Sequence, residues 1–302
     1  MDAALVERAL VDDRGRLHWP WRIAAFVFFS VAAYLVALTV IYPVIAGAFT
    51  LAGTRVVAWP WISLFALAVA HVLVRRTVDP AVTWAQLGLG REAFAAARVA
   101  RGFALGAAAI LVPCALLLAL GWFAFEPTEP GAWLGPSLTA ACVLVPAALY
   151  EELFFRGYGF VVLAERFGAR AALVITSLSF ALIHVLNPGA TAQSIALVTV
   201  AGLWLGVVRV VTGSLWAAFA AHFAWNAAMA LVLHASVSGF AFATPAYRMI
   251  DTGPAWATGG TWGPEGGVFA ALGMMAATAA LLARPQGRAL FTRPQGRGEI
   301  RT

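Results

Sequence analysis

The segment LTAACVLVPAALYEELFFRGYGFVVL, residues 138–163, decides the fold that the sequence predicts. Most of its side chains are apolar, and it is long enough for one helical crossing of a bilayer, whose hydrocarbon core of about 30 Å needs roughly 17 to 25 residues. Three charged residues interrupt it, namely Glu151, Glu152 and Arg156. Because charge inside a bilayer is costly and typically marks a functional site, the segment predicts a transmembrane helix that carries a buried polar cluster.

The composition of the whole chain also indicates a membrane protein. Of its 302 residues, 62% are hydrophobic and 11% are charged, and the mean hydropathy is +0.84, whereas soluble domains carry about 25% charged residues. Further apolar runs, the last of them short, extend over Ile23 to Phe49, Val56 to Val74, Phe103 to Phe125, Ala171 to Val185, Ile195 to Val211, Leu215 to Leu233 and Val268 to Ala283. We therefore predict an all-α polytopic membrane protein of about eight transmembrane helices.

The arginines predict the topology, because positive residues in short loops stay on the cytoplasmic side. All 20 basic residues are arginine, and most fall in loops and termini that the expected spans place on one side. Only Arg55 and Arg248 fall on the other side, and Arg156 lies within a span. We expect three parts, with both termini cytoplasmic: an N-terminal segment at 1–22, a transmembrane domain at 23–283 and a disordered tail at 284–302.

The same arginines bear on location and partners. A basic set made only of arginine is typical of GC-rich genomes, so we expect an integral protein of a bacterial cytoplasmic membrane. The isoelectric point is about 10.1, but the arginines punctuate apolar runs and form no basic face. The sequence therefore predicts no nucleic-acid partner.

The three charges of the 138–163 segment are not equivalent on a helix. Glu152 and Arg156 are i,i+4 neighbours that can form a salt bridge, whereas Glu151 points about 100° away from Glu152. One glutamate can thus be neutralised while the other remains free for chemistry. The alternative is an ion cluster that only stabilises the bundle.

Three further polar residues favour chemistry. His184 lies in one apolar run, and His222 and Asn226 form an i,i+4 pair on another. Each alone is compatible with ordinary helix packing. Counting 1.5 Å per residue from the expected span ends places these three and Glu151 at depths of about 12 to 20 Å. We therefore expect them to meet near the middle of the membrane.

These residues form three ordered motifs: Glu-Glu-x-x-x-Arg at 151–156, Phe-x-x-x-His at 180–184 and His-x-x-x-Asn at 222–226. In this the chain resembles the CAAX prenyl protease and bacteriocin-processing (CPBP, Abi) family of intramembrane endopeptidases. The resemblance covers roughly residues 138–234, the expected protease core. It implies a glutamate-type endopeptidase that acts on a peptide or membrane-protein substrate in the lipid bilayer.

Amide hydrolysis needs an activated water and stabilisation of the developing oxyanion. We expect Glu151 and His184 to activate the water, and His222 and Asn226 to form the oxyanion hole. Supporting roles fall to Glu152, Arg156 and Phe180.

Two alternatives remain open. Glu151, His184 and His222 could instead hold zinc with an open water position, although the His-Glu-x-x-His signature is absent and we expect no cofactor. The other alternative is a non-enzymatic protein, either a proton-coupled transporter or a scaffold derived from the family. The sequence does not indicate the substrate, the oligomeric state or the role of the 235–267 loop.

Overall fold

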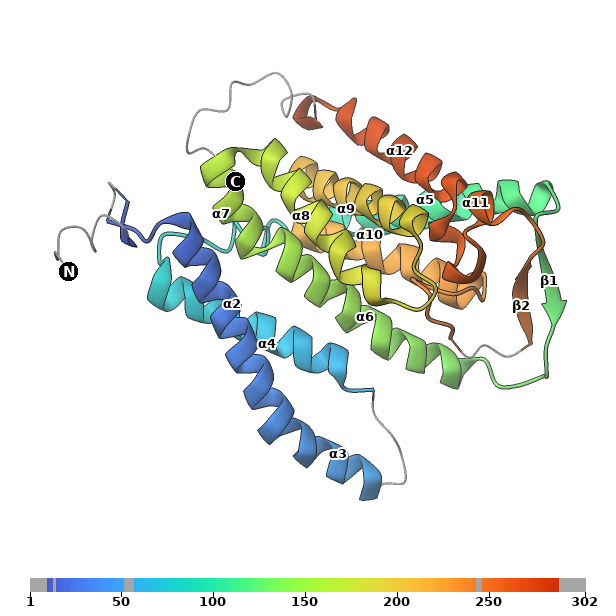
Figure 1. Ribbon diagram of the computed structural model, residues 1–302, viewed down its shortest axis with the longest axis horizontal. Coiled ribbons are helices and arrows are strands. Elements are labelled where there is room, and N and C mark those ends of the chain that lie inside the picture. The colour runs from blue at the N-terminus through green and yellow to red at the C-terminus, as the bar shows by residue number, and fades with distance from the viewer. Residues whose placement is uncertain (1–9, 13–14, 52–56, 243–245, 288–302) are drawn as a thin grey trace.

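The computed structural model describes residues 10–12, 15–51, 57–242 and 246–287, which form a helical bundle with one small sheet (Figure 1). The α-helices are α2 (Trp19–Val36), α3 (Tyr42–Leu51), α4 (Trp59–Leu73), α5 (Ala96–Ala119), α6 (Leu134–Arg156), α7 (Tyr158–Phe167), α8 (Ala169–Ile183), α9 (Ala192–Thr212), α10 (Leu215–Ala227), α11 (Ala255–Thr258) and α12 (Val268–Leu282). Short π- or 3-10-helical segments extend or join them: η1 (Ala37–Ile41), η2 (Val74–Val78), η3 (His184–Leu186), η4 (Ala228–Val232), η5 (Gly260–Trp262) and η6 (Pro264–Gly266). Arg55, half of the predicted N-terminal segment and the predicted tail beyond residue 287 lie outside the described residues.

The predicted all-α membrane fold is confirmed. Within the described residues, seven helices are long and apolar enough to cross a membrane: Trp19–Gly47, Trp59–Val78, Ala96–Ala119, Leu134–Phe167, Ala169–Leu186, Ala192–Thr212 and Leu215–Val232. The predicted eighth span corresponds to α12, which has 15 residues. Such a helix is about 22 Å long, shorter than the hydrocarbon core of about 30 Å. It packs against α5 and α9.

A two-stranded antiparallel sheet, which the sequence did not predict, joins two outer connections. β1 (Phe123–Pro127) pairs with β2 (Tyr247–Asp251), with Phe123 opposite Asp251. The sheet lies at the end of the bundle away from the start of α2 (Figure 1). Arg248 in β2 is therefore at the opposite end from Arg16, as the arginine pattern predicts. Which end faces the cytoplasm stays a prediction.

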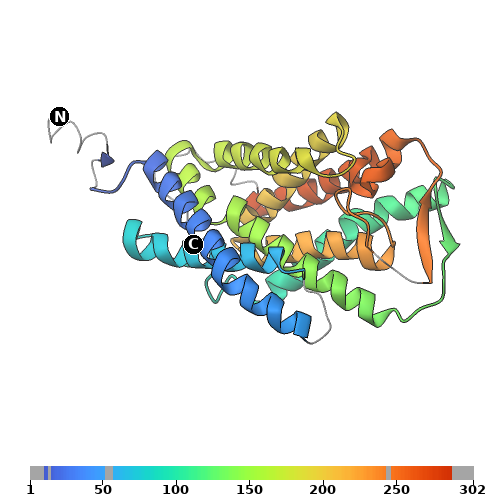
Figure 2. The ribbon, with the colours of Figure 1, turned by 60° about the horizontal axis from the view of Figure 1, so that its bottom comes forward.

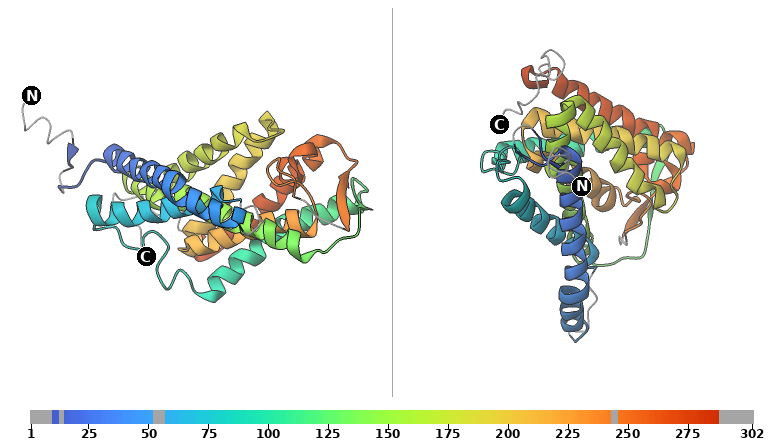
Figure 3. Two further views of the ribbon diagram at one scale, coloured as in Figure 1. Left: turned by 90° about the horizontal axis from the view of Figure 1, so that it is seen from below. Right: turned by 60° about the vertical axis from the view of Figure 1, so that its left-hand side comes forward.

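The N-terminal helix diverges from the rest of the bundle along its length. Figures 2 and 3 show α2 beside α4 and α7, while α3 projects away from the other helices. Only 17% of its apolar window is buried within the chain, against 67% for Leu215–Val232. In an integral membrane protein, lipid covers the apolar side chains that the protein leaves exposed.

The α10 helix lies at the centre of the packing, and small residues allow this. It packs closely against α5, where a Cβ atom at Gly102 or Gly106 would overlap the backbone carbonyls of Ala217 and Ala221. Small residues at a helix interface let two backbones approach within a membrane. This close approach fixes the position of α10, which carries the third motif.

The fourth predicted span is confirmed within Leu134–Phe167, but its helix is interrupted. It breaks at Gly157, between α6 and α7. A Cβ atom there would overlap the Leu153 carbonyl and the His71 ring. His71 Nε2 accepts a hydrogen bond of 3.2 Å from the Tyr158 backbone nitrogen, so it satisfies a donor that the break exposes.

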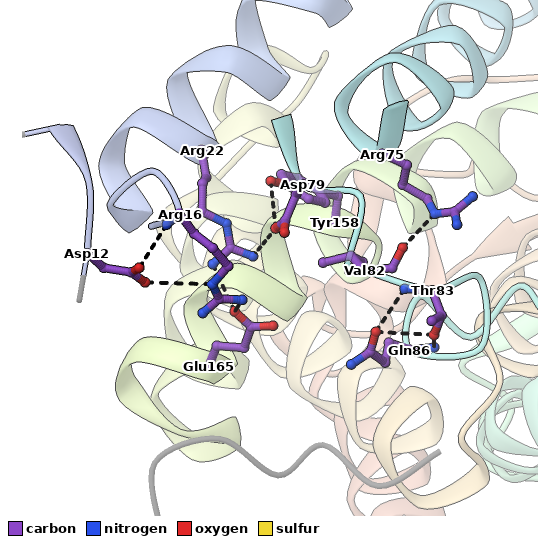
Figure 4. A network of polar contacts seen from close by, with 10 residues as sticks. All are labelled: Asp12, Arg16, Arg22, Arg75, Asp79, Val82, Thr83, Gln86, Tyr158 and Glu165. Atoms are coloured by element: carbon purple, nitrogen blue, oxygen red, sulfur yellow. Dashed lines mark hydrogen bonds and ion pairs between the residues drawn. The ribbon is translucent and has the colours of Figure 1, made fainter. Parts of the chain in front are cut away.

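A buried ion network ties the start of α2 to the α7 helix (Figure 4). Arg22 donates hydrogen bonds to Glu165, at 2.8 Å, and to Asp79. The Tyr158 hydroxyl donates to the same Asp79 at 3.3 Å. Arg22 was predicted to precede the first span, but α2 already begins at Trp19, because Pro20 fits the first turn of a helix. Arg22 is therefore a buried structural cation, with 4% of its side chain exposed.

We predict that Arg22→Ala destabilises the protein, because it leaves the Asp79 carboxylate buried without its cation. Breaking a buried ion pair in this way costs about 3 to 5 kcal/mol. Thermal unfolding of the purified protein in detergent measures the loss. The control is Arg248→Ala, which removes a surface ion pair whose arginine is 63% exposed and which is worth at most about 1 kcal/mol. Equal melting temperatures for the two variants would contradict the prediction.

Candidate active site

The Glu152 carboxylate joins two of the three motifs. Its Oε1 accepts a hydrogen bond of 3.1 Å from Arg156 Nη1, which confirms the predicted i,i+4 salt bridge. The same oxygen lies 3.0 Å from His222 Nδ1. Both Glu152 and Arg156 are fully buried, and Glu152 Oε2 has no hydrogen-bond partner. Glu152 thus fixes the ring of a histidine that comes from α10.

Arg156 has two further contacts that hold it in place. Its Nη2 donates a hydrogen bond of 3.0 Å to the Gly202 carbonyl of α9. Its guanidinium carbon lies 4.5 Å from the centre of the Phe180 ring of α8, an arrangement in which the aromatic face attracts the cation. The same ring packs against His184 and His222, with centroids 4.7 Å and 5.9 Å apart. Phe180 is thus a packing centre shared by all three motifs.

Glu151, unlike Glu152, forms no ion pair with an arginine among the described residues. Its Oε2 lies 3.8 Å from His222 Nε2. Its Oε1 accepts a hydrogen bond of 3.3 Å from the Tyr150 hydroxyl, and the Tyr150 ring packs edge-on against Trp59 of α4. His222 therefore lies between the two glutamates of the first motif, with one ring nitrogen towards each.

The second and third motifs meet in a small cavity. His184, His222, Asn226 and Phe180 all line it. Its volume is about 20 Å³, enough for a water molecule, which needs about 10 to 15 Å³. His184 Nδ1 lies 2.7 Å from the Phe180 carbonyl. Because a carbonyl only accepts, Nδ1 carries the proton and the Nε2 of a neutral ring is left with a lone pair.

The predicted site residues thus come from three helices that the fold brings together. The structure places Glu151 beside His222, and His222 beside His184 and Asn226 around the cavity. No direct hydrogen bond joins Glu151 to His184. In the part of the chain that the structure describes, no three His, Cys, Asp or Glu side chains are arranged to hold one metal ion. The zinc set of Glu151, His184 and His222 is therefore not assembled in this geometry.

Sequence reasoning missed the outer wall of the cavity, which Ser238 and Glu265 supply together with Trp225. Glu265 Oε2 accepts a hydrogen bond of 2.9 Å from Trp225 Nε1. Its Oε1 accepts two bonds of 2.6 Å, from the backbone nitrogen and the hydroxyl of Ser238. The 235–267 loop thus folds back onto the site. The available signal was weak, because this Gly- and Thr-rich loop holds two acidic residues, Asp251 and Glu265.

The fold and site define an integral membrane protein with a buried glutamate–histidine centre. Residues 133–228 match the family described as type II CAAX prenyl endopeptidase Rce1-like. The matched segment holds all three motifs, in agreement with the predicted family resemblance. No curated protein and no solved structure matches the chain.

We predict that Glu152→Gln impairs stability at least as much as turnover. The amide can still accept from His222, but it leaves the Arg156 guanidinium buried without a counter-charge, at a cost of about 3 to 5 kcal/mol. The melting temperature in detergent and the cleavage rate at low temperature separate the two effects. Glu126→Gln, at the surface ion pair with Arg248, is the matched control. A fully stable Glu152→Gln variant would show that Arg156 does not depend on this carboxylate.

Proposed function

We propose that the protein is an intramembrane endopeptidase of the glutamate type, which hydrolyses a peptide bond near or within the membrane. One observation carries the proposal. Among the described residues, Glu151 forms no ion pair with an arginine and faces His222, and His184, His222 and Asn226 line one cavity that has room for a water molecule. The family of the 133–228 segment supports an endopeptidase.

In this proposal the water lies between Glu151 and His184. Glu151 takes a proton from it as general base, and the lone pair on His184 Nε2 accepts the second hydrogen bond. The oxygen then attacks the carbonyl carbon of the substrate. When the carbon–nitrogen bond breaks, Glu151 returns the proton to the leaving amine. Phe180 supports this step, because its backbone carbonyl fixes the orientation of the His184 ring.

We assign the stabilisation of the substrate's oxyanion to hydrogen bonds from Asn226 and His222. The Asn226 amide donates a hydrogen bond at any pH near neutrality. His222 differs, because its Nδ1 already donates to Glu152 and its Nε2 donates only when the ring is doubly protonated. We therefore propose that His222 donates to the oxyanion from Nε2 when its ring is doubly protonated. The Nε2 proton then remains close to Glu151. Donors placed in advance around a developing oxyanion are among the strongest contributions to catalysis.

The substrate is proposed to be a peptide or a membrane protein that reaches the site within the bilayer. The matched family is described as a CAAX prenyl endopeptidase. The arginine-only basic set favours a bacterial origin, and we therefore propose a peptide substrate without a prenyl group. We place the arginine-rich end of the bundle in the cytoplasm, according to the charge rule for short loops. A proton-coupled transporter or a scaffold is the competing function, and neither requires cleavage.

We predict that Glu151→Gln and His184→Ala each abolish cleavage while expression is retained. Loss of a general base lowers the rate by at least about a hundredfold. The measurement compares the membrane and secreted peptidomes of cells that express each variant or the wild type, followed by cleavage of the identified peptide by purified protein. Glu126→Gln should cleave like the wild type. Retained cleavage in either site variant would refute the roles assigned, and identical peptidomes for all proteins would favour the transporter or scaffold.

We also predict that a strong chelator leaves cleavage unchanged, because Glu151 and the two histidines are not arranged around one ion. Purified protein is assayed before and after dialysis against the chelator, with elemental analysis of both samples. Loss of activity that zinc restores would replace the metal-free mechanism with the zinc alternative.

A further inference from the structure

The outer wall of the catalytic cavity carries a carboxylate of its own. Glu265 lies in η6, outside the seven long helices, and lines the same cavity as His184, His222 and Asn226. It is held over the site by a loop that is docked at several points. Asn187 Nδ2 donates to the Ser238 carbonyl at 3.1 Å, and Gln193 Nε2 donates to the Gly266 carbonyl at 2.8 Å. The loop contacts therefore hold Glu265 in a defined position in the wall of the cavity.

The three hydrogen bonds of Glu265 all come from neutral donors. They are the Trp225 indole, the Ser238 backbone nitrogen and the Ser238 hydroxyl, at 2.6 to 2.9 Å. Among the described residues, no arginine or histidine forms an ion pair with this carboxylate. Its negative charge is thus stabilised by hydrogen bonds alone and is not cancelled.

The present cavity is too small for a peptide. At about 20 Å³ it holds little more than one water molecule, which needs about 10 to 15 Å³. A substrate that reaches His184 and Asn226 must therefore displace part of the lining. Ser238 and Glu265 come from the outer loop, whereas the other lining residues come from helices that pack within the bundle. Displacement of Ser238 leaves the Glu265 carboxylate short of donors, which is costly in a partly buried place.

We propose that Glu265 determines the specificity of the site: it selects peptides with a positively charged side chain next to the scissile bond. Such a group replaces the donors that the carboxylate loses and pairs with its charge. An acidic side chain, or a free C-terminal carboxylate at that position, meets a like charge instead. This inference rests on the proposed endopeptidase function, because it concerns the substrate of that same site.

The test measures binding separately from cleavage. Three fluorescent apolar peptides share one sequence except for Arg, Gln or Glu beside the central bond. Their dissociation constants are measured by fluorescence anisotropy for the Glu151→Gln protein in non-ionic detergent, where no peptide is turned over. The same peptides are measured with Glu151→Gln combined with Glu265→Gln, with Ser238→Ala, or with Glu126→Gln at the surface ion pair with Arg248.

We expect the Arg peptide to bind at least roughly tenfold more tightly than the Glu peptide, since unit charges a few ångströms apart interact strongly near a protein surface. Glu265→Gln should reduce this ratio to about twofold or less. Ser238→Ala removes one donor but keeps the charge, so it should preserve the ratio, as should Glu126→Gln. A ratio that is absent in the Glu151→Gln parent, that survives Glu265→Gln, or that Ser238→Ala lowers equally would overturn the proposal.

The failure of the proposed function would look different. In that case the wild-type protein cleaves none of the three peptides and no peptide from the peptidome comparison, whatever the binding ratios are. Cleavage of a substrate by the wild type together with an unchanged charge preference after Glu265→Gln would refute the specificity assignment alone.

Discussion

The shared hydrogen bonding of the Glu152 carboxylate is the interaction on which the site depends. One oxygen accepts from Arg156 of its own helix and from His222 of α10. The pair within α6 neutralises the charge locally, and the bond to His222 fixes the ring between two glutamates. Two polar contacts between these helices end on His222, at 3.0 Å from Glu152 and 3.8 Å from Glu151, and they hold α6 and α10 in a common register. The position of Glu151 relative to the cavity follows from that register.

The close packing of α10 makes this bond possible at a defined depth. Gly102 and Gly106 of α5 let the backbone of α10 approach closely, and Gly202 of α9 lies where a Cβ atom would overlap Ser177 of α8. The Gly202 carbonyl then accepts from Arg156. Small residues in a membrane bundle thus do two things at once, because they allow close packing and they expose backbone carbonyls to a buried cation. The site is polar in its centre, while its outer helix faces remain apolar.

Much of this could be predicted from the sequence, and the parts that could not share one physical reason. The spans and the Glu152–Arg156 pair follow from run length and from i,i+4 spacing, both of which are local. The bond between Glu152 and His222 joins residues 70 positions apart, so no periodicity indicates it. The break at Gly157 depends on the His71 ring from α4. Glu265 was missed because its partners, Trp225 and Ser238, are distant in sequence and its loop has no repeating pattern.

The energetics of the cluster of Glu151, Glu152, Arg156 and His222 argue against a role limited to stabilising the helix bundle. A buried ion pair seldom stabilises a protein more than well-packed apolar residues of similar volume do, because desolvation offsets the attraction between the charges. Here the balance is less favourable still, since no protein group hydrogen-bonds to the buried Glu152 Oε2 and Arg156 Nε. A purely structural cluster would gain from saturating those atoms, and it would not need a second carboxylate 3.8 Å from the same histidine. In the proposed mechanism, the Glu152–Arg156 pair orients His222, and the charge of Glu151 is available for a bound water.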